Sequence, residues 1–167
     1  NMSHRPGNYS LIVAQVDIIL QQTRYAKAEI VFIVTVIDTG PDFRQQMLRE
    51  KVQKLTAVIY THEHKDHVAG MDDIRAFNFF QKKHIDIYAT ERVQEAIKRE
   101  FAYIFAAEKY PGIPQINLNT IENKPFRINN TKFIPIQLMH HKMPVAGFRV
   151  GDFTYITDAN YINEEEK

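Results

Sequence analysis

Four side chains that commonly ligate metal ions lie within six residues of this chain: His62, His64, Asp66 and His67. Imidazole and carboxylate ligands together suit zinc, manganese or iron. The cluster follows a short apolar run, residues 57–60, which predicts a buried strand that ends in a tight loop. A solvated polar loop with coincidental histidines is the alternative, and so dense a group of ligands disfavours it.

The spacing of these ligands favours two metal ions over one. His62 and His64 point to the same side if the chain there is extended, because side chains alternate along a strand. Gly70 and the two aspartates after it predict a helix that starts near His67, and the preceding loop turns Asp66 and His67 toward a neighbouring position. One short segment can then serve two ions a few ångströms apart, as in two-metal hydrolysis.

The pattern H-x-H-x-D-H after an apolar strand resembles the signature of the metallo-β-lactamase superfamily. Further segments resemble the branch that contains the phosphoribosyl cyclic phosphodiesterase; they are residues 36–44, 70–75, 139–140, 144–149 and 155–158. The resemblance covers about residues 34–163 and implies an α/β fold, the layered αββα sandwich of that superfamily. Residues 1–167 are therefore interpreted as a single domain of this kind.

The resemblance also implies six metal ligands: His62, His64, Asp66, His67, His140 and Asp158. It assigns His62, His64 and His140 to one ion and Asp66 and His67 to the other. Asp158 would be the carboxylate that bridges both ions. Asp66, which would orient a metal-bound hydroxide, and Asp158 are the expected catalytic carboxylates. Asp158 also follows a strand-like run, residues 153–157, although a turn or helix-cap aspartate is the alternative there.

The neighbouring His140 and His141 require a choice. If this segment is extended, only one of them can face the site, since neighbours on a strand point in opposite directions. His140 is preferred because it follows the predicted strand at residues 133–138 and matches the family pattern, while His141 remains the alternative. His4 and His84 are interpreted as surface residues.

Three further residues are expected near the ligands. Asp38 ends an apolar run, residues 30–37, and metal-bound imidazoles commonly donate their second N–H to a carboxylate; a turn aspartate before Gly-Pro is the alternative. Asp73 is expected to support the site in the same way, and it matches the family pattern together with Arg75. Lys142 is a candidate cation for a substrate phosphate. An ordinary charged surface is the alternative for these last three residues.

Composition restricts the class of protein. The 167 residues are 44% hydrophobic, enough for one ordinary core. A net charge of +1, from 21 basic and 20 acidic residues, shows no broad surface for nucleic acid, so a compact substrate fits better. The absence of cysteine suits a reducing compartment, and we expect a cytoplasmic protein. The apolar stretches at residues 11–20 and 30–37 are too short or interrupted to span a bilayer, and the first residues lack a secretory pattern.

Strand-like runs dominate the chain, with one amphipathic helix predicted over residues 91–109. The aromatic residues of that helix are interpreted as core packing. Asn129-Asn130 and Gly151-Asp152 predict hairpin turns. Strands, a helix and strands again imply a layered α/β or α+β sandwich in which sheet edges carry the metal-binding loops.

The chain departs from the family pattern at both ends. Residues 1–29 contain only Gly7 and do not resemble the strand and Gly-Thr-Gly-type loop with which the family opens. In the family, the portion after the bridging aspartate supplies the second half of the sandwich, another histidine ligand and often a histidine that acts as general acid. We therefore expect a domain that is incomplete at its C-terminus, or completed by another copy or segment, and we identify no leaving-group acid.

The reaction implied is hydrolysis of a small phosphodiester by a hydroxide bridging two divalent ions, zinc being favoured and manganese or iron the alternatives. Other members of the superfamily hydrolyse lactones, thioesters or β-lactams, so these substrates stay open. A nuclease that processes tRNA 3′ ends is disfavoured by the near-neutral charge. From a different class, a non-catalytic metal-binding or interaction domain remains an alternative. The expected partners are a small-molecule substrate and further copies of the chain, without nucleic acid or membrane.

Overall fold

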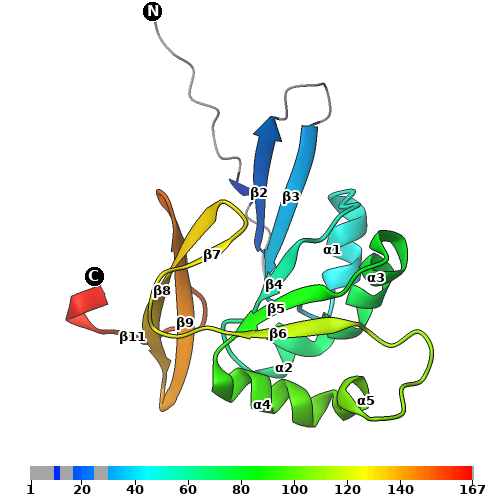
Figure 1. Ribbon diagram of the computed structural model, residues 1–167. Helices are drawn as coiled ribbons and strands as arrows, with labels where there is room; N and C mark the ends of the chain where they lie inside the picture. Colours follow the sequence, from blue (N-terminus) through cyan, green and yellow to red (C-terminus); the bar gives the residue numbers. More distant parts are fainter. Residues whose placement is uncertain (1–9, 12–16, 25–29, 167) are drawn as a thin grey trace, which may run out of the picture.

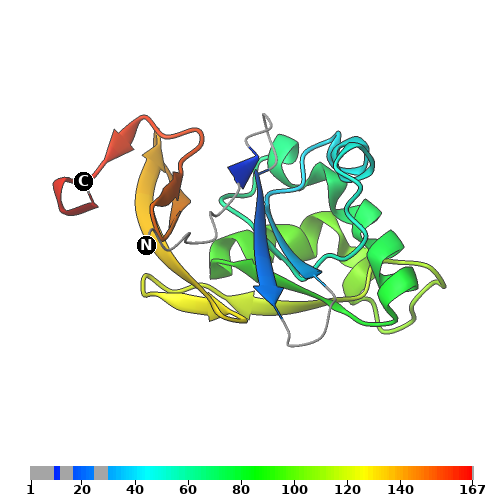
Figure 2. The ribbon, with the colours of Figure 1, turned by 90° about the horizontal axis from the view of Figure 1, so that it is seen from above.

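The computed structural model describes residues 10–11, 17–24 and 30–166 of the chain. The described residues form a mixed α/β structure in which two sheets pack together and helices cover one face of the first sheet (Figures 1 and 2). The predicted fold class is therefore confirmed, and the helix, sheet and sheet layers correspond to the N-terminal part of an αββα sandwich. The prediction for His4 lies outside the described residues.

The first sheet combines an antiparallel hairpin with parallel strands. β2 pairs antiparallel with β3, whereas β3, β4, β5 and β6 run parallel to one another in chain order. Parallel neighbours end at the same edge of a sheet, so the loops that follow β3 and β4 meet there. The strands of this sheet are β1 Ser10–Leu11, β2 Asp17–Arg24, β3 Ile30–Ile37, β4 Ala57–Ile59, β5 Ile85–Ala89 and β6 Ile116–Thr120.

The second sheet is antiparallel and is built from short hairpins. Two of its turns, Asn129-Asn130 and Gly151-Asp152, are the predicted ones, and the pairings Ile128 with Thr131 and Val150 with Phe153 confirm both. The strands are β7 Phe126–Ile128, β8 Thr131–His140, β9 Met143–Val150, β10 Phe153–Tyr155 and β11 Tyr161–Ile162. A short 3-10 helix, η2 Glu164–Glu166, follows.

The helices pack on the face of the first sheet that points away from the second sheet (Figure 2). The described helices are α1 Phe43–Arg49, α2 Lys65–Val68, the 3-10 helix η1 Ala69–Ile74, α3 Arg75–Gln81, α4 Glu91–Glu100 and α5 Ala102–Phe105. None of them has the length and apolar character needed to cross a bilayer.

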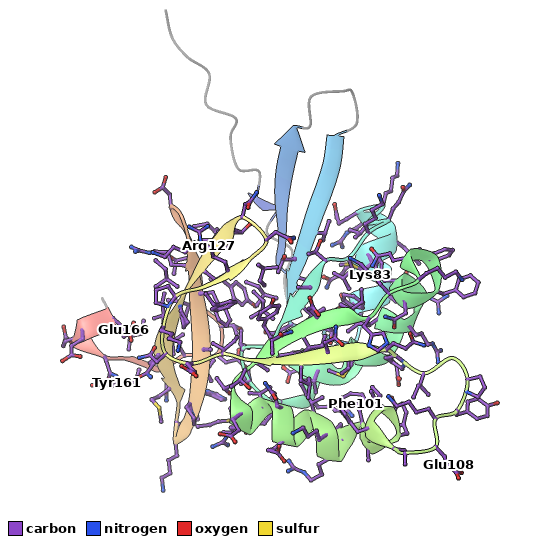
Figure 3. All side chains as sticks on the ribbon, in the orientation of Figure 1. Lys83, Phe101, Glu108, Arg127, Tyr161 and Glu166 are labelled. Carbon is purple, nitrogen blue, oxygen red and sulfur yellow. The ribbon has the colours of Figure 1, made fainter. Side chains whose placement is uncertain are left out.

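Alternation along β4 creates two apolar cores. Val58 faces the helices, whereas Ala57 and Ile59 face the second sheet, where they meet residues such as Phe133 and Phe148. Side chains fill the space between the two sheets, as Figure 3 shows. This double burial explains why β4 reads as a continuous apolar run and why its end, which carries the histidine cluster, is fixed on both sides.

A third apolar cluster lies on the other face of the second sheet. Leu138 and Val145 are buried there, and Ala159 and Ile162 of the C-terminal segment pack against them. Beyond this cluster, Tyr161 and Glu166 project from the C-terminal segment (Figure 3). The segment that carries Asp158 is thus attached to the second sheet by apolar contacts.

The predicted helix over residues 91–109 is wrong in its length. α4 ends at Glu100, Phe101 adopts φ −113° and ψ 44°, and the short α5 ends at Phe105. Helices in proteins depend on the burial of an apolar face. Here that burial extends only to Ile104, because Phe105 is 37% exposed and Glu108 is exposed.

Two local predictions also need correction. The helix expected to start near His67 begins at Lys65, directly after His64. His141 and Lys142 form a two-residue turn between β8 and β9 rather than a continuing strand, and His141 has a positive φ of 55°. His141 therefore does not alternate with His140 as neighbours on a strand do, because it lies in the turn.

We predict that Gly70→Ala destabilises the fold by about 1–3 kcal/mol, the usual cost of overpacking. A Cβ at this position would lie 2.5 Å from the carbonyl oxygen of Gly40 and 2.6 Å from Cβ of Phe43. The backbone of Gly70 also donates a hydrogen bond to the carbonyl of Thr39, so the two segments cannot separate freely.

Urea unfolding followed by circular dichroism measures this change. Gly151→Asn is the control, since Gly151 has φ 58° with no atom near its missing Cβ, and asparagine tolerates that conformation. The control should stay within about 0.5 kcal/mol of the wild type. Equal stability of Gly70→Ala and the wild type would show that Gly40 and Phe43 can move away from residue 70 without loss of stability.

Candidate metal centre

The histidine cluster lies where parallel strands of the first sheet end. Asp38 follows β3, and the segment that contains the clustered ligands follows β4. The second sheet supplies His140 from the end of β8 and Asp158 from the segment after β10. The amide of Ala146 on β9 donates a hydrogen bond to the carbonyl of Thr61, which joins the two layers at this point.

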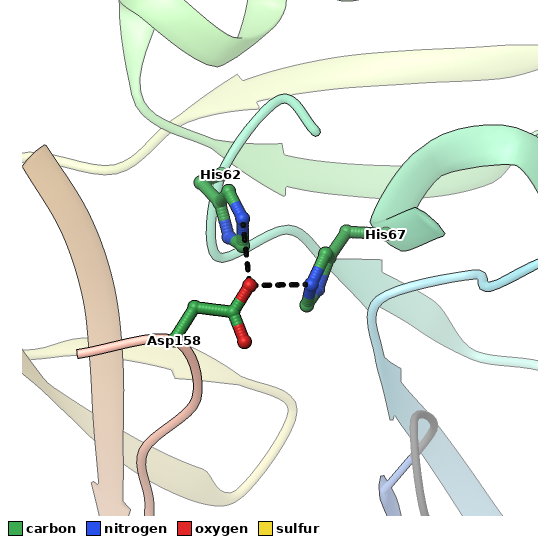
Figure 4. A group of neighbouring side chains, drawn as sticks. All are labelled: His62, His67 and Asp158. Atoms are coloured by element: carbon green, nitrogen blue, oxygen red, sulfur yellow. Dashed lines mark hydrogen bonds and ion pairs between the residues drawn. The ribbon is translucent and has the colours of Figure 1, made fainter. Parts of the chain in front are cut away.

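One group of ligand atoms consists of His62, His67 and Asp158, which Figure 4 shows. Oδ2 of Asp158 lies 3.2 Å from Nε2 of His67 and 3.5 Å from Nε2 of His62. The two imidazole rings are 4.0 Å apart between centroids. Both histidines are buried, whereas the side chain of Asp158 is 32% exposed. Asp158 therefore lies on the solvent side of the two rings.

A second group consists of His64, His140 and again Asp158. The rings of His64 and His140 are 5.4 Å apart between centroids. Asp66 lies beside the first group, with Oδ2 3.7 Å from Nε2 of His67 and a side chain that is 54% exposed. All six predicted ligands thus come together, and Asp158 is common to both groups.

His62 occupies a position between the two groups. Its ring centroid lies 4.0 Å from that of His67, 4.8 Å from that of His64 and 6.4 Å from that of His140. The sequence resemblance places His62 with His64 and His140, whereas the closest ring contact is with His67. Both arrangements keep His62 within reach of an ion beside Asp158.

Asp38 is fully buried and fixes the orientation of His67. Its Oδ2 lies 2.8 Å from Nδ1 of His67 and accepts a hydrogen bond from the Thr61 hydroxyl, and its Oδ1 accepts one from the Thr61 amide. A carboxylate can only accept, so Nδ1 of His67 carries the proton and Nε2 presents its lone pair toward Asp158. This is the contact that the sequence predicted for Asp38, a carboxylate that accepts a hydrogen bond from the imidazole of a candidate metal ligand.

Thr61 plays a similar part for His62, and sequence reasoning missed it. The single hydroxyl hydrogen of Thr61 goes to Asp38, so the oxygen accepts from Nδ1 of His62, 2.9 Å away. Nε2 of His62 then also presents a lone pair to the site. Apart from its position beside His62, nothing in the sequence marks Thr61, because its partner Asp38 lies 23 residues earlier.

The surroundings shift the pKa values of His62, His67 and Asp158, and only the shifts of His62 and Asp158 favour the form that ligates a metal. Burial and, to a smaller extent, the neighbouring His67 lower the pKa of His62 to about 4, so the ring is neutral at pH 7. Burial also lowers the pKa of His67, but the hydrogen bond and charge of Asp38 outweigh this and raise it. Burial raises the pKa of Asp158, yet the Thr157 hydroxyl and the two histidines bring it below its ordinary value.

These residues fit divalent cations. Nε2 of His62 is buried and has no hydrogen-bond partner among the described residues, an arrangement that is costly unless another group occupies its lone pair. Imidazole nitrogens and carboxylate oxygens are the donors that zinc, manganese and iron accept. The chemistry of the donor set and the unpaired nitrogen therefore agree.

Other predicted site residues lie elsewhere. Asp73 and Arg75 line a groove of about 1260 Å³ between α1 and α3, and no contact of the described residues joins Asp73 to the clustered histidines. His141 donates its amide to Asn160 and is exposed in the turn beside His140, as is Lys142. His84 is exposed, and its ring lies 3.2 Å from the side-chain oxygen of Asn117.

Several known proteins resemble this chain. An octanoyltransferase of Porphyromonas gingivalis is 36% identical over 132 residues, which make up 78% of this chain and 26% of that protein. A ribonuclease Z of Nostoc is 26% identical over 70% of this chain and 36% of its own length. The crystal structure of a diphosphatase from the PhnP family superposes with a TM-score of 0.71 at 33% identity, covering 80% of this chain and 51% of that one.

The chain spans between 26% and 51% of the length of these three proteins. The family model for the beta-lactamase superfamily domain matches residues 35–167, the part that contains all six clustered side chains. The predicted family is confirmed, and the chain belongs to the metallo-β-lactamase superfamily.

Proposed function

We propose that this chain is a metal-dependent hydrolase that binds two divalent cations and acts on a small phosphodiester. The observation that carries the proposal is the shared carboxylate of Asp158, which lies within 4.8 Å of the ring nitrogens of two pairs of histidines. A carboxylate between two ligand groups is the arrangement expected where one residue bridges two ions.

The proposed ligands divide around Asp158. His64 and His140 would hold one ion, Asp66 and His67 the other, and His62 lies next to both. Zinc suits this mixture of imidazole and carboxylate best, with manganese or iron as alternatives. Two bound cations would activate water for attack and neutralise negative charge that develops on the phosphoryl oxygens.

The protein's own residues prepare the site before any ligand arrives. Asp38 and Thr61 fix which nitrogen of His67 and His62 faces inward, so no proton has to move between ring nitrogens when a cation binds. Asp66 lies at the exposed side of the group and can orient an attacking water. Lys142, exposed in the turn after His140, is the proposed contact for a substrate phosphate.

Two similarities support a phosphorus centre as the point of attack. One relative is named a diphosphatase and another a ribonuclease, and both names denote cleavage at phosphorus. The net charge of +1 favours a compact substrate over a long polyanion. A tRNA-processing activity like that of ribonuclease Z is the second candidate, supported by 26% identity over 121 residues.

The metal content of the purified chain tests the proposed ligands. Elemental analysis of untagged protein prepared without chelators should find about two ions per chain. His140→Ala should retain about one, because one ligand group loses a histidine. His141→Ala is the matched control, since it removes the adjacent, exposed imidazole, and it should bind as the wild type does. A wild type without metal, or equal losses in both variants, would contradict the assignment.

Replacement of Asp158 separates an enzyme from a binding module. Asp158→Ala should lower hydrolysis of bis(p-nitrophenyl) phosphate by about 100-fold or more, because it removes the carboxylate that both ligand groups share. Circular dichroism should show that the fold is retained, since Asp158 is partly exposed.

Asp152→Ala is the control, an exposed aspartate in the turn between β9 and β10, and its activity should match the wild type. A lactone, a thioester and a short RNA tested beside the phosphodiester identify the other substrate classes. Undiminished turnover in Asp158→Ala would disprove its role, and a metal-loaded wild type inactive on every substrate would favour a non-catalytic domain.

A further inference from the structure

We propose that helix α4 positions the metal-ligating segment through the two residues of the H-x-H-x-D-H motif that are not ligands, Glu63 and Lys65. This inference rests on the proposed function, because the positions that matter are those of the neighbouring ligands. The two residues carry opposite charges, and each forms an ion pair with an oppositely charged residue of α4.

The first pair joins Glu63 to Arg92 in the first turn of α4. Oε1 of Glu63 lies 2.7 Å from Nε and 2.6 Å from an Nη of Arg92. Two N–H groups of the guanidinium thus donate to one carboxylate oxygen. Glu63 is only 16% exposed, and its other oxygen, Oε2, is buried without a hydrogen-bond partner among the described residues. The carboxylate therefore depends on Arg92, because an unpaired charge at this depth is unfavourable.

The second pair joins Lys65 to Glu100 at the opposite end of α4. The ammonium group of Lys65 also lies 5.5 Å from the ring centroid of Phe101. The side chains of Lys65 and Glu100 are 66% and 47% exposed, so solvent screens this ion pair. It therefore contributes less than the first pair to holding the segment in place. In the first pair the motif residue is acidic and the α4 residue is basic, whereas in the second pair the motif residue is basic and the α4 residue is acidic. Only one direction of the segment along α4 therefore forms both ion pairs.

Helix α4 is a firm base for these contacts. Val93 and Ile97 of α4, and Phe101 directly after it, are each at most 5% exposed and pack into the core between the helices and the first sheet. Beyond the end of α4, the Tyr103 hydroxyl donates a hydrogen bond to Asp72 of η1, the element that follows the motif. Helix α4, which is anchored by its buried face, thus contacts the segment at both of its non-ligand motif positions, and the following α5 contacts η1 beyond the motif.

The position of Glu63 affects the distances between the proposed metal ligands. His62 and His64 flank Glu63, so a shift of Glu63 moves both imidazoles relative to Asp158. Ligands held within a fraction of an ångström bind and react far better than ligands displaced by about 1 Å. Arg92 is therefore a positioning residue for the metal centre, although it contacts no ligand among the described interactions.

Cobalt(II) binding by the full chain tests this inference. Titration against a chromophoric chelator measures affinity, and the visible absorption of bound cobalt reports ligand geometry. Arg92→Ala should bind cobalt about 10-fold more weakly, with an altered spectrum, by analogy with the loss of residues that orient ligands. Arg92→Lys keeps the charge and should restore most of the affinity. Because Arg92 is 53% exposed, these variants should fold.

Lys98→Ala is the matched control. It breaks an ion pair of the same kind on the same helix, between Lys98 and Glu95, which does not involve the motif. Its affinity and spectrum should equal those of the wild type. An Arg92→Ala chain that binds like the wild type, or an equal loss in Lys98→Ala, would overturn the inference and leave the proposed function intact. A wild type that takes up no cobalt would overturn the proposed function itself.

Discussion

A buried aspartate at the end of β3 is the interaction on which the rest of the site depends. Asp38 holds a positive φ of 62°, which costs about 1–2 kcal/mol for a residue other than glycine. Its carboxylate interacts with the amide and hydroxyl of Thr61 and with the ring of His67, and hydrogen bonds to charged groups contribute about 1.5–3 kcal/mol each. These bonds exceed the backbone strain, and they lock the end of β3 to the segment after β4.

The candidate metal centre also depends on contact between two layers that are distant in the sequence. The first sheet contributes a continuous segment, residues 61–67, whereas His140 and Asp158 come from the second sheet and the chain that follows it. The backbone hydrogen bond from Ala146 to Thr61 and the apolar core between the sheets fix their separation. Packing of the two sheets therefore sets the distance between ligands, and chemistry at the site is tied to stability of the sandwich.

The sequence predicted correctly that His62, His64, Asp66 and His67 lie together after a buried strand, because their spacing and the preceding apolar run are local features. It also predicted the turns at residues 129–130 and 151–152, where asparagine or glycine signals a tight hairpin. The turn at His141 and Lys142 contains neither glycine nor asparagine, so the sequence left open whether this segment is extended. The contacts of Thr61, the groove position of Asp73 and the end of α4 depend on tertiary packing, which periodicity does not report.

X-ray absorption spectroscopy of the zinc-loaded chain would determine whether two cations lie on either side of Asp158. The extended X-ray absorption fine structure should contain a metal–metal scattering path at about 3.5–4 Å, the separation found in two-metal sites. Nitrogen and oxygen neighbours at about 2.0–2.2 Å should account for the first coordination sphere. Loaded protein that shows the nearer ligands without any metal–metal path would contradict a shared Asp158 carboxylate.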